Sequence, residues 1–126
     1  MDTAKVGNNK YFHGKYADAE ATRGWFVGSF LSKGHPCKTK KIEIQFAIQE
    51  KGHICKKHYH KEKIEINIIL DGKVNYWINE DLVEIGSGEF IFVKKNNIVK
   101  AEFLEKTKLF SIHSPSIPTD KIMVGE

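Results

Sequence analysis

The chain has 126 residues, of which 40% are hydrophobic and 29% charged, so it is long enough for one domain with its own core and is not expected to be disordered. Its formal net charge of +4 comes from 20 basic residues, but only Arg23 is an arginine and the lysines are spread among acidic residues, which argues against nucleic-acid binding. No apolar stretch reaches the ~20 residues of a membrane span, and the segment MDTAKVGNNKYFHGKY has no apolar signal core.

In chain order, the first elements are short. Residues 16–22 (YADAEAT) have a helical composition, and the apolar runs 25–27 and 30–31 predict a leading strand that lies against a second subunit. Residues 41–49 alternate isoleucine and phenylalanine with more polar residues, which is the period of a half-buried strand. The polar side of this strand, with Glu43 and Gln45, either faces solvent or lines a pocket.

The rest of the chain also predicts strands, at 64–70, 74–78, 82–85, 90–93, 98–104 and 109–113, with turn signals such as Asp71–Gly72 between them. Many short strands with frequent turns are typical of an all-β barrel or sandwich. The two prolines at 115 and 118 predict an extended surface segment. We expect one domain over residues 1–126, with an N-terminal arm at 1–23, a barrel core at 41–113 and a C-terminal strap at 114–126.

One segment between the predicted strands carries the chemistry. His58 and His60 are two residues apart, so on a strand their side chains project to the same side. Glu65 lies five residues further on, an odd offset, and shares that side only if the chain bends or bulges between 61 and 64. Two imidazoles and one carboxylate would then form a 2-His-1-carboxylate ligand set. Such a set is typical of Fe(II) sites, and it can also bind Mn, Ni, Co or Zn.

This segment resembles the first motif of the cupin superfamily. That motif is a glycine, five residues, His-x-His, three or four residues, a glutamate, six residues and a glycine, and the matching residues here are Gly52, His58, His60, Glu65 and Gly72. The resemblance, which covers about residues 41–113, implies a double-stranded β-helix (cupin barrel, or jelly-roll) with the two histidines and the glutamate as ligands of a divalent metal ion.

The second cupin motif is degenerate in this chain. After Gly88, Lys94 stands at the proline of the motif, Asn96 at its second glycine, Val99 at its histidine and Phe103 at its asparagine. The fourth metal ligand is therefore missing. Its position could be filled by His113, by His53, or most simply by water or substrate.

Other residues are candidates for the pocket or for the core. Asn67 has the same parity as Glu65 and should point into the same cavity, and Val99 would make one wall of that cavity apolar. Tyr76 and Trp77 are packing residues or, less simply, a platform for a substrate. Cys55 is expected to be a small buried residue, and with Cys37 as the other cysteine the thiols should be free, as in a cytoplasmic protein.

Two functions fit these residues. One is a metal-dependent enzyme (isomerase or epimerase, lyase, or oxygenase) in which the ion acts as a Lewis acid on a small polar metabolite. The other is a non-catalytic barrel that binds a small ligand or a metal. The sequence identifies no general base, and a third interpretation, a metal-free sugar-nucleotide isomerase or epimerase, needs an inward His–Asp or His–Tyr pair that the sequence does not show. In each case we expect a homodimer, because edge strands and the apolar run 25–31 need covering.

Overall fold

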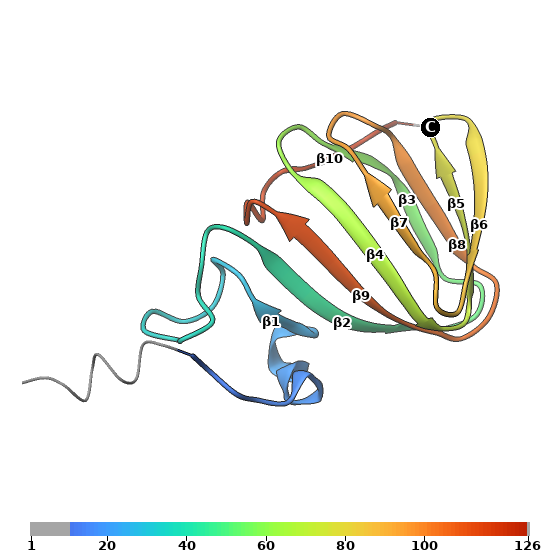
Figure 1. Ribbon diagram of the computed structural model, residues 1–126. Helices are drawn as coiled ribbons and strands as arrows, with labels where there is room; N and C mark the ends of the chain where they lie inside the picture. Colours follow the sequence, from blue (N-terminus) through green and yellow to red (C-terminus); the bar gives the residue numbers. More distant parts are fainter. Residues whose placement is uncertain (1–10, 126) are drawn as a thin grey trace, which may run out of the picture.

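The computed structural model describes residues 11–125. Within them, ten strands form two five-stranded antiparallel sheets, sheet A with the order β1-β2-β9-β4-β7 and sheet B with the order β10-β3-β8-β5-β6 (Figure 1). The all-β jelly-roll prediction is confirmed. The elements are the 3₁₀ helix η1 (Tyr16–Thr22) and the strands β1 (Trp25–Val27), β2 (Glu43–Gln49), β3 (Ile54–His60), β4 (Ile64–Asp71), β5 (Lys73–Ile78), β6 (Asp81–Gly86), β7 (Phe90–Val93), β8 (Val99–Phe103), β9 (Thr107–Ser114) and β10 (Lys121–Met123).

The strands predicted from residue 41 onward correspond to β2 and β4–β9, with ends that differ by a few residues. The predicted leading strand is only partly right. Residues 25–27 form β1, but residues 30 and 31 lie in a turn, because the chain leaves the extended conformation at Gly28 (φ +153°). Strand β10 falls in the segment that was expected only to be extended.

The interior of the barrel is polar at one end and apolar at the other. In sheet A, the pairing aligns Glu43 with His113 and His113 with Glu65, so the three side chains form one inward row across β2, β9 and β4. Two rows further along, Ala47, Leu109 and Ile69 form an apolar row that belongs to the hydrophobic core. The barrel therefore has a packed apolar end that stabilises the fold and a polar end that is free to carry a site.

Strand β2 turns its polar side inward. Glu43 is 2% exposed and Ala47 is buried, whereas Ile48 on the other side is 48% exposed. Of the two orientations that the sequence left open, the structure adopts the one in which Glu43 lines the interior. The outward apolar side is covered in part by the N-terminal segment, where the ring of Tyr16 lies 4.7 Å from that of Phe46.

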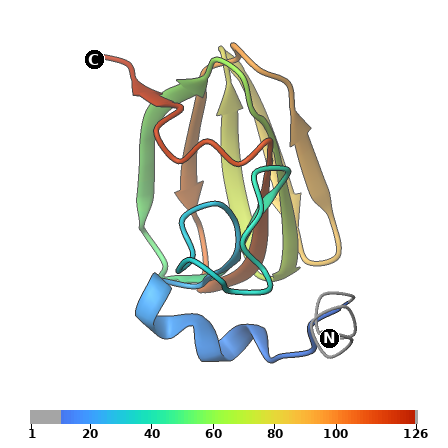
Figure 2. The ribbon, with the colours of Figure 1, turned by 90° about the vertical axis from the view of Figure 1, so that its left-hand side faces the viewer.

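The segment after β9 crosses from one sheet to the other. It leaves sheet A at Ser114 and joins sheet B as β10, which pairs with β3 (Figure 2). Ser116 in this segment donates a hydrogen bond to Glu43, so the strap is tied to the interior as well as to the edge of sheet B.

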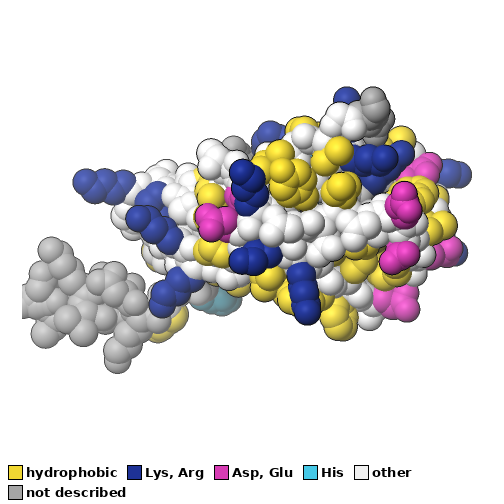
Figure 3. All heavy atoms as spheres, turned by 90° about the horizontal axis from the view of Figure 1, so that it is seen from above, with side chains coloured by type: hydrophobic (Ala, Val, Ile, Leu, Met, Phe, Trp, Pro, Cys, Tyr) yellow, Lys and Arg dark blue, Asp and Glu magenta, His cyan; other side chains and the backbone are white. Residues whose placement is uncertain are grey.

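The surface is of mixed charge. On the face in Figure 3, lysine side chains are spread over the whole width of the molecule, with acidic and hydrophobic side chains among them. No helix in the described part of the chain is long and apolar enough to cross a membrane.

The last glycine of the first motif is required by a close approach between strands. Gly72 has a φ of +127°, and a Cβ atom there would lie 2.3 Å from Oγ1 of Thr107. A larger residue would therefore push β4 and β5 away from β9, which carries inward residues of the polar end.

Candidate metal centre

The bend between β3 and β4 is a corner between the two sheets. His58 and His60 project inward from β3 in sheet B, and Glu65 projects inward from β4 in sheet A. The odd spacing between His60 and Glu65 is therefore accommodated by a change of sheet, and the glutamate faces the two histidines from the opposite wall of the barrel.

The three side chains converge on one point. Nε2 of His58 lies 3.9 Å and Nε2 of His60 lies 3.3 Å from Oε1 of Glu65, and the ligand atoms of the three residues all lie within 4.8 Å of one another. All three residues are buried, with exposed fractions of 5–8%. The structure thus brings together the residues that the spacing singled out.

Backbone carbonyls orient both imidazoles. Nδ1 of His58 lies 2.8 Å from the carbonyl oxygen of Lys56, and Nδ1 of His60 lies 2.8 Å from that of Asp120. Because a carbonyl oxygen can only accept, Nδ1 carries the proton in each ring and Nε2 presents its lone pair to the common point. This is the tautomer that a metal ion requires.

The carboxylate of Glu65 is held by a relay of side chains. The amide of Asn67 donates to its Oε2 at 2.7 Å, and the hydroxyl of Ser111 donates to Oδ1 of Asn67 at 2.7 Å. Asn67 therefore points into the interior as its parity predicted, and its amide is satisfied by neighbouring side chains. The relay leaves Oε1 of Glu65 facing the histidines.

The facing atoms fit a bound cation. Nε2 of His60 and Oε1 of Glu65 are both buried without a hydrogen-bond partner among the described residues, and such orphaned atoms are costly. Burial raises the pKa of Glu65, but hydrogen bonds from His58 and His60, which form when Nε2 carries a proton, and the hydrogen bond from Asn67 lower it well below its usual value. The carboxylate is therefore ionised, and a divalent ion would supply the positive charge that these lone pairs lack.

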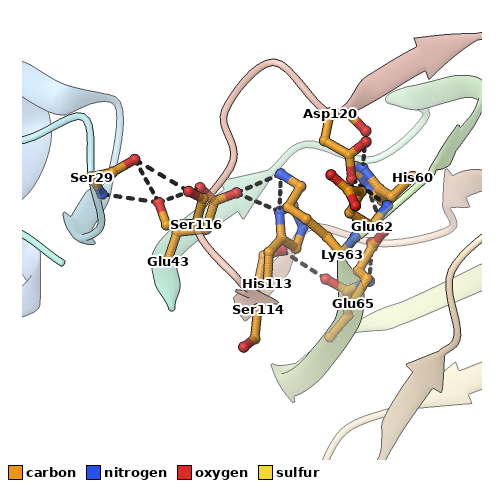
Figure 4. A network of polar contacts seen from close by, with 12 residues as sticks. Ser29, Glu43, His60, Glu62, Lys63, Glu65, His113, Ser114, Ser116 and Asp120 are labelled. Atoms are coloured by element: carbon orange, nitrogen blue, oxygen red, sulfur yellow. Dashed lines mark hydrogen bonds and ion pairs between the residues drawn. The ribbon is translucent and has the colours of Figure 1, made fainter. Parts of the chain in front are cut away.

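A second buried cluster adjoins this site (Figure 4). Nζ of Lys63 lies 2.6 Å from Oε1 of Glu43, and Nδ1 of His113 lies 2.9 Å from the same oxygen. Burial raises the pKa of Glu43, but the contacts with His113, Lys63 and Ser116 lower it to about 2. The rings of His113 and His60 are 5.0 Å apart, so the two clusters share a wall.

The sequence named Glu43 as a possible pocket residue and His113 as a possible fourth ligand, but it did not group them with each other or with Lys63. The members of this second cluster come from three distant positions, 43, 63 and 113, and Lys63 is only 3% exposed. The available signal was parity, since Lys63 lies two residues before Glu65 and so shares its side of the chain.

The other candidates are placed as follows. Val99 is 2% exposed and pairs with His58 across β3 and β8, so an apolar side chain stands beside the position of the missing ligand. Tyr76 belongs to the hydrophobic core, where burial raises its pKa. His53 is exposed in the turn before β3. His113 is not part of the group of converging ligand atoms among the described residues, and its Nδ1 lies 2.9 Å from Oε1 of Glu43.

Both cysteines are free, as expected. Cys55 packs against the core and is half-buried, and burial raises the pKa of its thiol. A protonated thiol is a poor nucleophile and a poor ligand, which agrees with a packing role.

Comparison with known proteins identifies the family. The model of the cupin domain matches residues 45–102, which include all three converging side chains. The chain therefore contains a cupin domain over these residues. None of the curated protein sequences is significantly similar to this cupin.

Solved structures share its double-stranded β-helix at low sequence identity. KdgF from Halomonas sp. is 15% identical with a TM-score of 0.60, over 63% of this chain and 73% of that chain. An uncharacterised conserved protein from Klebsiella pneumoniae with a double-stranded β-helix domain is 14% identical (TM-score 0.63, 70% and 74%). Streptomyces Pac13 in complex with uridine is 14% identical (TM-score 0.55, 69% and 80%).

Proposed function

We propose that this cupin is a metal-dependent enzyme that acts on a small polar metabolite, with His58, His60 and Glu65 as the ligands of one divalent ion. The observation that carries the proposal is the pair of buried, unpartnered atoms, Nε2 of His60 and Oε1 of Glu65, which face each other at 3.3 Å. Fe(II), Mn, Ni, Co and Zn all accept such a ligand set. When bound, the ion would act as a Lewis acid on a carbonyl, carboxylate or enediol oxygen.

The second cluster supports the catalytic interpretation over simple binding. Nδ1 of His113 lies 2.9 Å from Oε1 of Glu43 and 3.1 Å from Nζ of Lys63. These two side chains hold the ring, and its Nε2 has no hydrogen-bond partner among the described residues. An imidazole oriented by a buried carboxylate is the arrangement of a general base or acid. We assign to Nε2 of His113 the proton transfer to or from a substrate bound beside the three ligands.

Two further observations bear on this function. Pac13 is described as a nucleoside dehydratase and has been solved with uridine, so a barrel of this fold holds a small polar molecule. The His113–Glu43 pair resembles the inward His–Asp pair that the metal-free isomerase or epimerase needs, with glutamate in place of aspartate, so that reaction is the second candidate. Dependence on added metal distinguishes the two.

Turnover is expected on screening keto acids, sugar phosphates, thiols and nucleosides with added Fe(II), Mn(II), Ni(II) or Zn(II). We expect His113→Gln to lower kcat by roughly 10²- to 10⁴-fold, the usual contribution of a positioned acid or base, while the bound metal is retained. His53→Gln, in an exposed turn, is the matched control and should leave kcat unchanged. Full activity after metal removal would favour the metal-free reaction, and thermal shifts without turnover would favour the non-catalytic barrel.

We also propose a homodimer, but through a different surface from the run 25–31. Leu31 is already 7% exposed, and the ring of Trp25 packs on those of Phe30 and His113 within its own chain. The uncovered surface is the outer side of sheet A, on which β4 and β7 pair Ile66 with Phe92 and Ile68 with Phe90. Exposed large apolar side chains side by side on the face of a sheet are typical of a protein–protein interface.

Light scattering is expected to show a particle of twice the 14.4 kDa chain mass. Phe90 and Phe92 are 66% and 47% exposed, and changing both to lysine should weaken the dimer by roughly a thousandfold, since each interface aromatic contributes about 2 kcal/mol. Leu82→Lys is the control, because Leu82 is 58% exposed on β6 of the other sheet. A wild-type monomer would contradict the proposal. We also propose a cytoplasmic location, which the two free thiols favour.

A further inference from the structure

The C-terminal segment meets the candidate metal centre at Asp120. This residue lies just before β10, at the corner where the chain passes from β3 to β4, and is 7% exposed (Figure 4). Its Oδ1 accepts the backbone N–H of Lys61 at 3.0 Å, and its Oδ2 accepts those of Glu62 and Lys63 at 2.9 Å each. One carboxylate thus satisfies three consecutive amides of the corner.

The backbone of the same segment contacts the histidine strand. The carbonyl oxygen of Asp120 accepts the hydrogen bond of Nδ1 of His60 at 2.8 Å. Strand β10 then pairs with β3, with Met123 opposite His58, and the N–H of Val124 donates to the carbonyl of Lys57. The segment therefore supports both histidines, one through its ring and one through its strand.

The corner determines the geometry of the three ligands. It is the only chain between His60 and Glu65, so its shape sets how the two side chains approach each other across the interior. Three successive amides can point at one acceptor only in a tight bend, and without the carboxylate the N–H of the buried residue Lys63 would lose its hydrogen-bond partner. Relaxation of the bend would move Glu65 relative to the histidines.

We propose that Asp120 is a positioning residue of the metal centre, whose carboxylate holds the corner between the ligands and whose carbonyl fixes the tautomer of His60. The proposal rests on the proposed metal site but goes beyond it, because Asp120 lies outside the residues matched by the cupin model. Groups that orient metal ligands in this way typically change metal affinity 10- to 100-fold when they are replaced.

The test is Co(II) binding to the full chain, followed by calorimetry and by the visible absorption bands of the ion. We expect Asp120→Asn, which places an amide against three N–H donors, to weaken Co(II) binding roughly 10- to 100-fold and to change the absorption bands. Asp81→Asn removes the same charge from the exposed first residue of β6, at the edge of sheet B opposite β10, and should bind as the wild type does. Asp120→Glu keeps the charge and the acceptor atoms and should recover part of the affinity.

A readout in the metal-free protein separates this inference from the proposed function. The ¹⁵N chemical shifts of the His60 ring should show the proton on Nδ1 in the wild type and a mixture of tautomers in Asp120→Asn. If Asp120→Asn is unfolded, the same shifts and the same titration are compared in Asp120→Glu. A folded variant with the affinity, absorption bands and His60 tautomer of the wild type would overturn the inference. If the wild type itself fails to bind Co(II), the proposed metal site is wrong. The comparison of the His60 tautomer in the wild type and the variant then tests the role of Asp120 alone.

Discussion

Changing His58 and His60 together to alanine is expected to abolish metal binding. The purified wild type should contain close to one divalent ion per chain, and the double variant should contain none, because both Nε2 lone pairs that face Glu65 are removed. Metal analysis measures the content directly. The melting temperature provides a second measurement, since an ion at 100 times its Kd stabilises the folded state by about 2.7 kcal/mol.

The matched control for this experiment is His53→Ala. His53 precedes the same strand but is exposed in a turn, and its ring lies 5.9 Å from that of Phe103 rather than near Glu65. It should leave the metal content and the metal-dependent stabilisation unchanged. A wild-type protein that carries no ion and binds none on titration would contradict the assignment of all three ligands.

Changing Lys63 to methionine is expected to destabilise the fold by about 3–5 kcal/mol, the usual cost of leaving one partner of a buried ion pair uncompensated. Lys63 and Glu43 are 3% and 2% exposed and lie 2.6 Å apart, so the carboxylate has little access to water when the ammonium is removed. Combining Lys63→Met with Glu43→Gln should restore much of the loss, because both charges are then absent. Urea denaturation of the metal-free proteins gives the four free energies of the cycle.

Lys73→Met is the control for this cycle. Lys73 pairs with Glu84 at 3.6 Å on the surface, and exposed pairs of this kind contribute about 0–1 kcal/mol.

The pH dependence of the free energy of unfolding offers an independent check of the buried pair. Because the folded-state pKa of Glu43 is lowered to about 2 from its usual value of 4.5, its contribution to stability is complete above pH 4.5 and is lost as the pH falls towards 2. Equal stability of Lys63→Met and the wild type would show that the pair is not a determinant of the fold.

Local patterns in the sequence were enough to predict β2, β4–β9 and the three converging side chains. The alternation of residues 41–49 and the hairpin signal at Asp71–Gly72 act over a few residues, so they need no knowledge of distant contacts. His58 and His60 face the same way for the same local reason. What the spacing could not decide was how Glu65 joins them, because the answer is a change of sheet rather than a bulge within one strand.

The orientation of β2 shows a limit of periodicity. A period of two separates Glu43 and Ala47 from Ile44 and Phe46, but it does not say which set is inside. Hydrophobicity alone favours burial of the isoleucines. The structure instead places Glu43 inside, where its carboxylate lies within hydrogen-bond distance of Lys63 and His113 and the ammonium of Lys63 balances its charge. The ring of Tyr16 covers part of the outward apolar side.

By itself, the sequence determined an all-β barrel and the identity of three residues that can share an ion, because strand period and motif spacing are local properties. Only the tertiary structure decided which groups surround that point. Glu43, Lys63, His113 and Asp120 come from positions far apart along the chain, and their contacts exist only after the two sheets have closed and the C-terminal segment has crossed between them. The position of the proposed dimer surface also depends on the tertiary structure, because it is the side of sheet A that faces away from the interior.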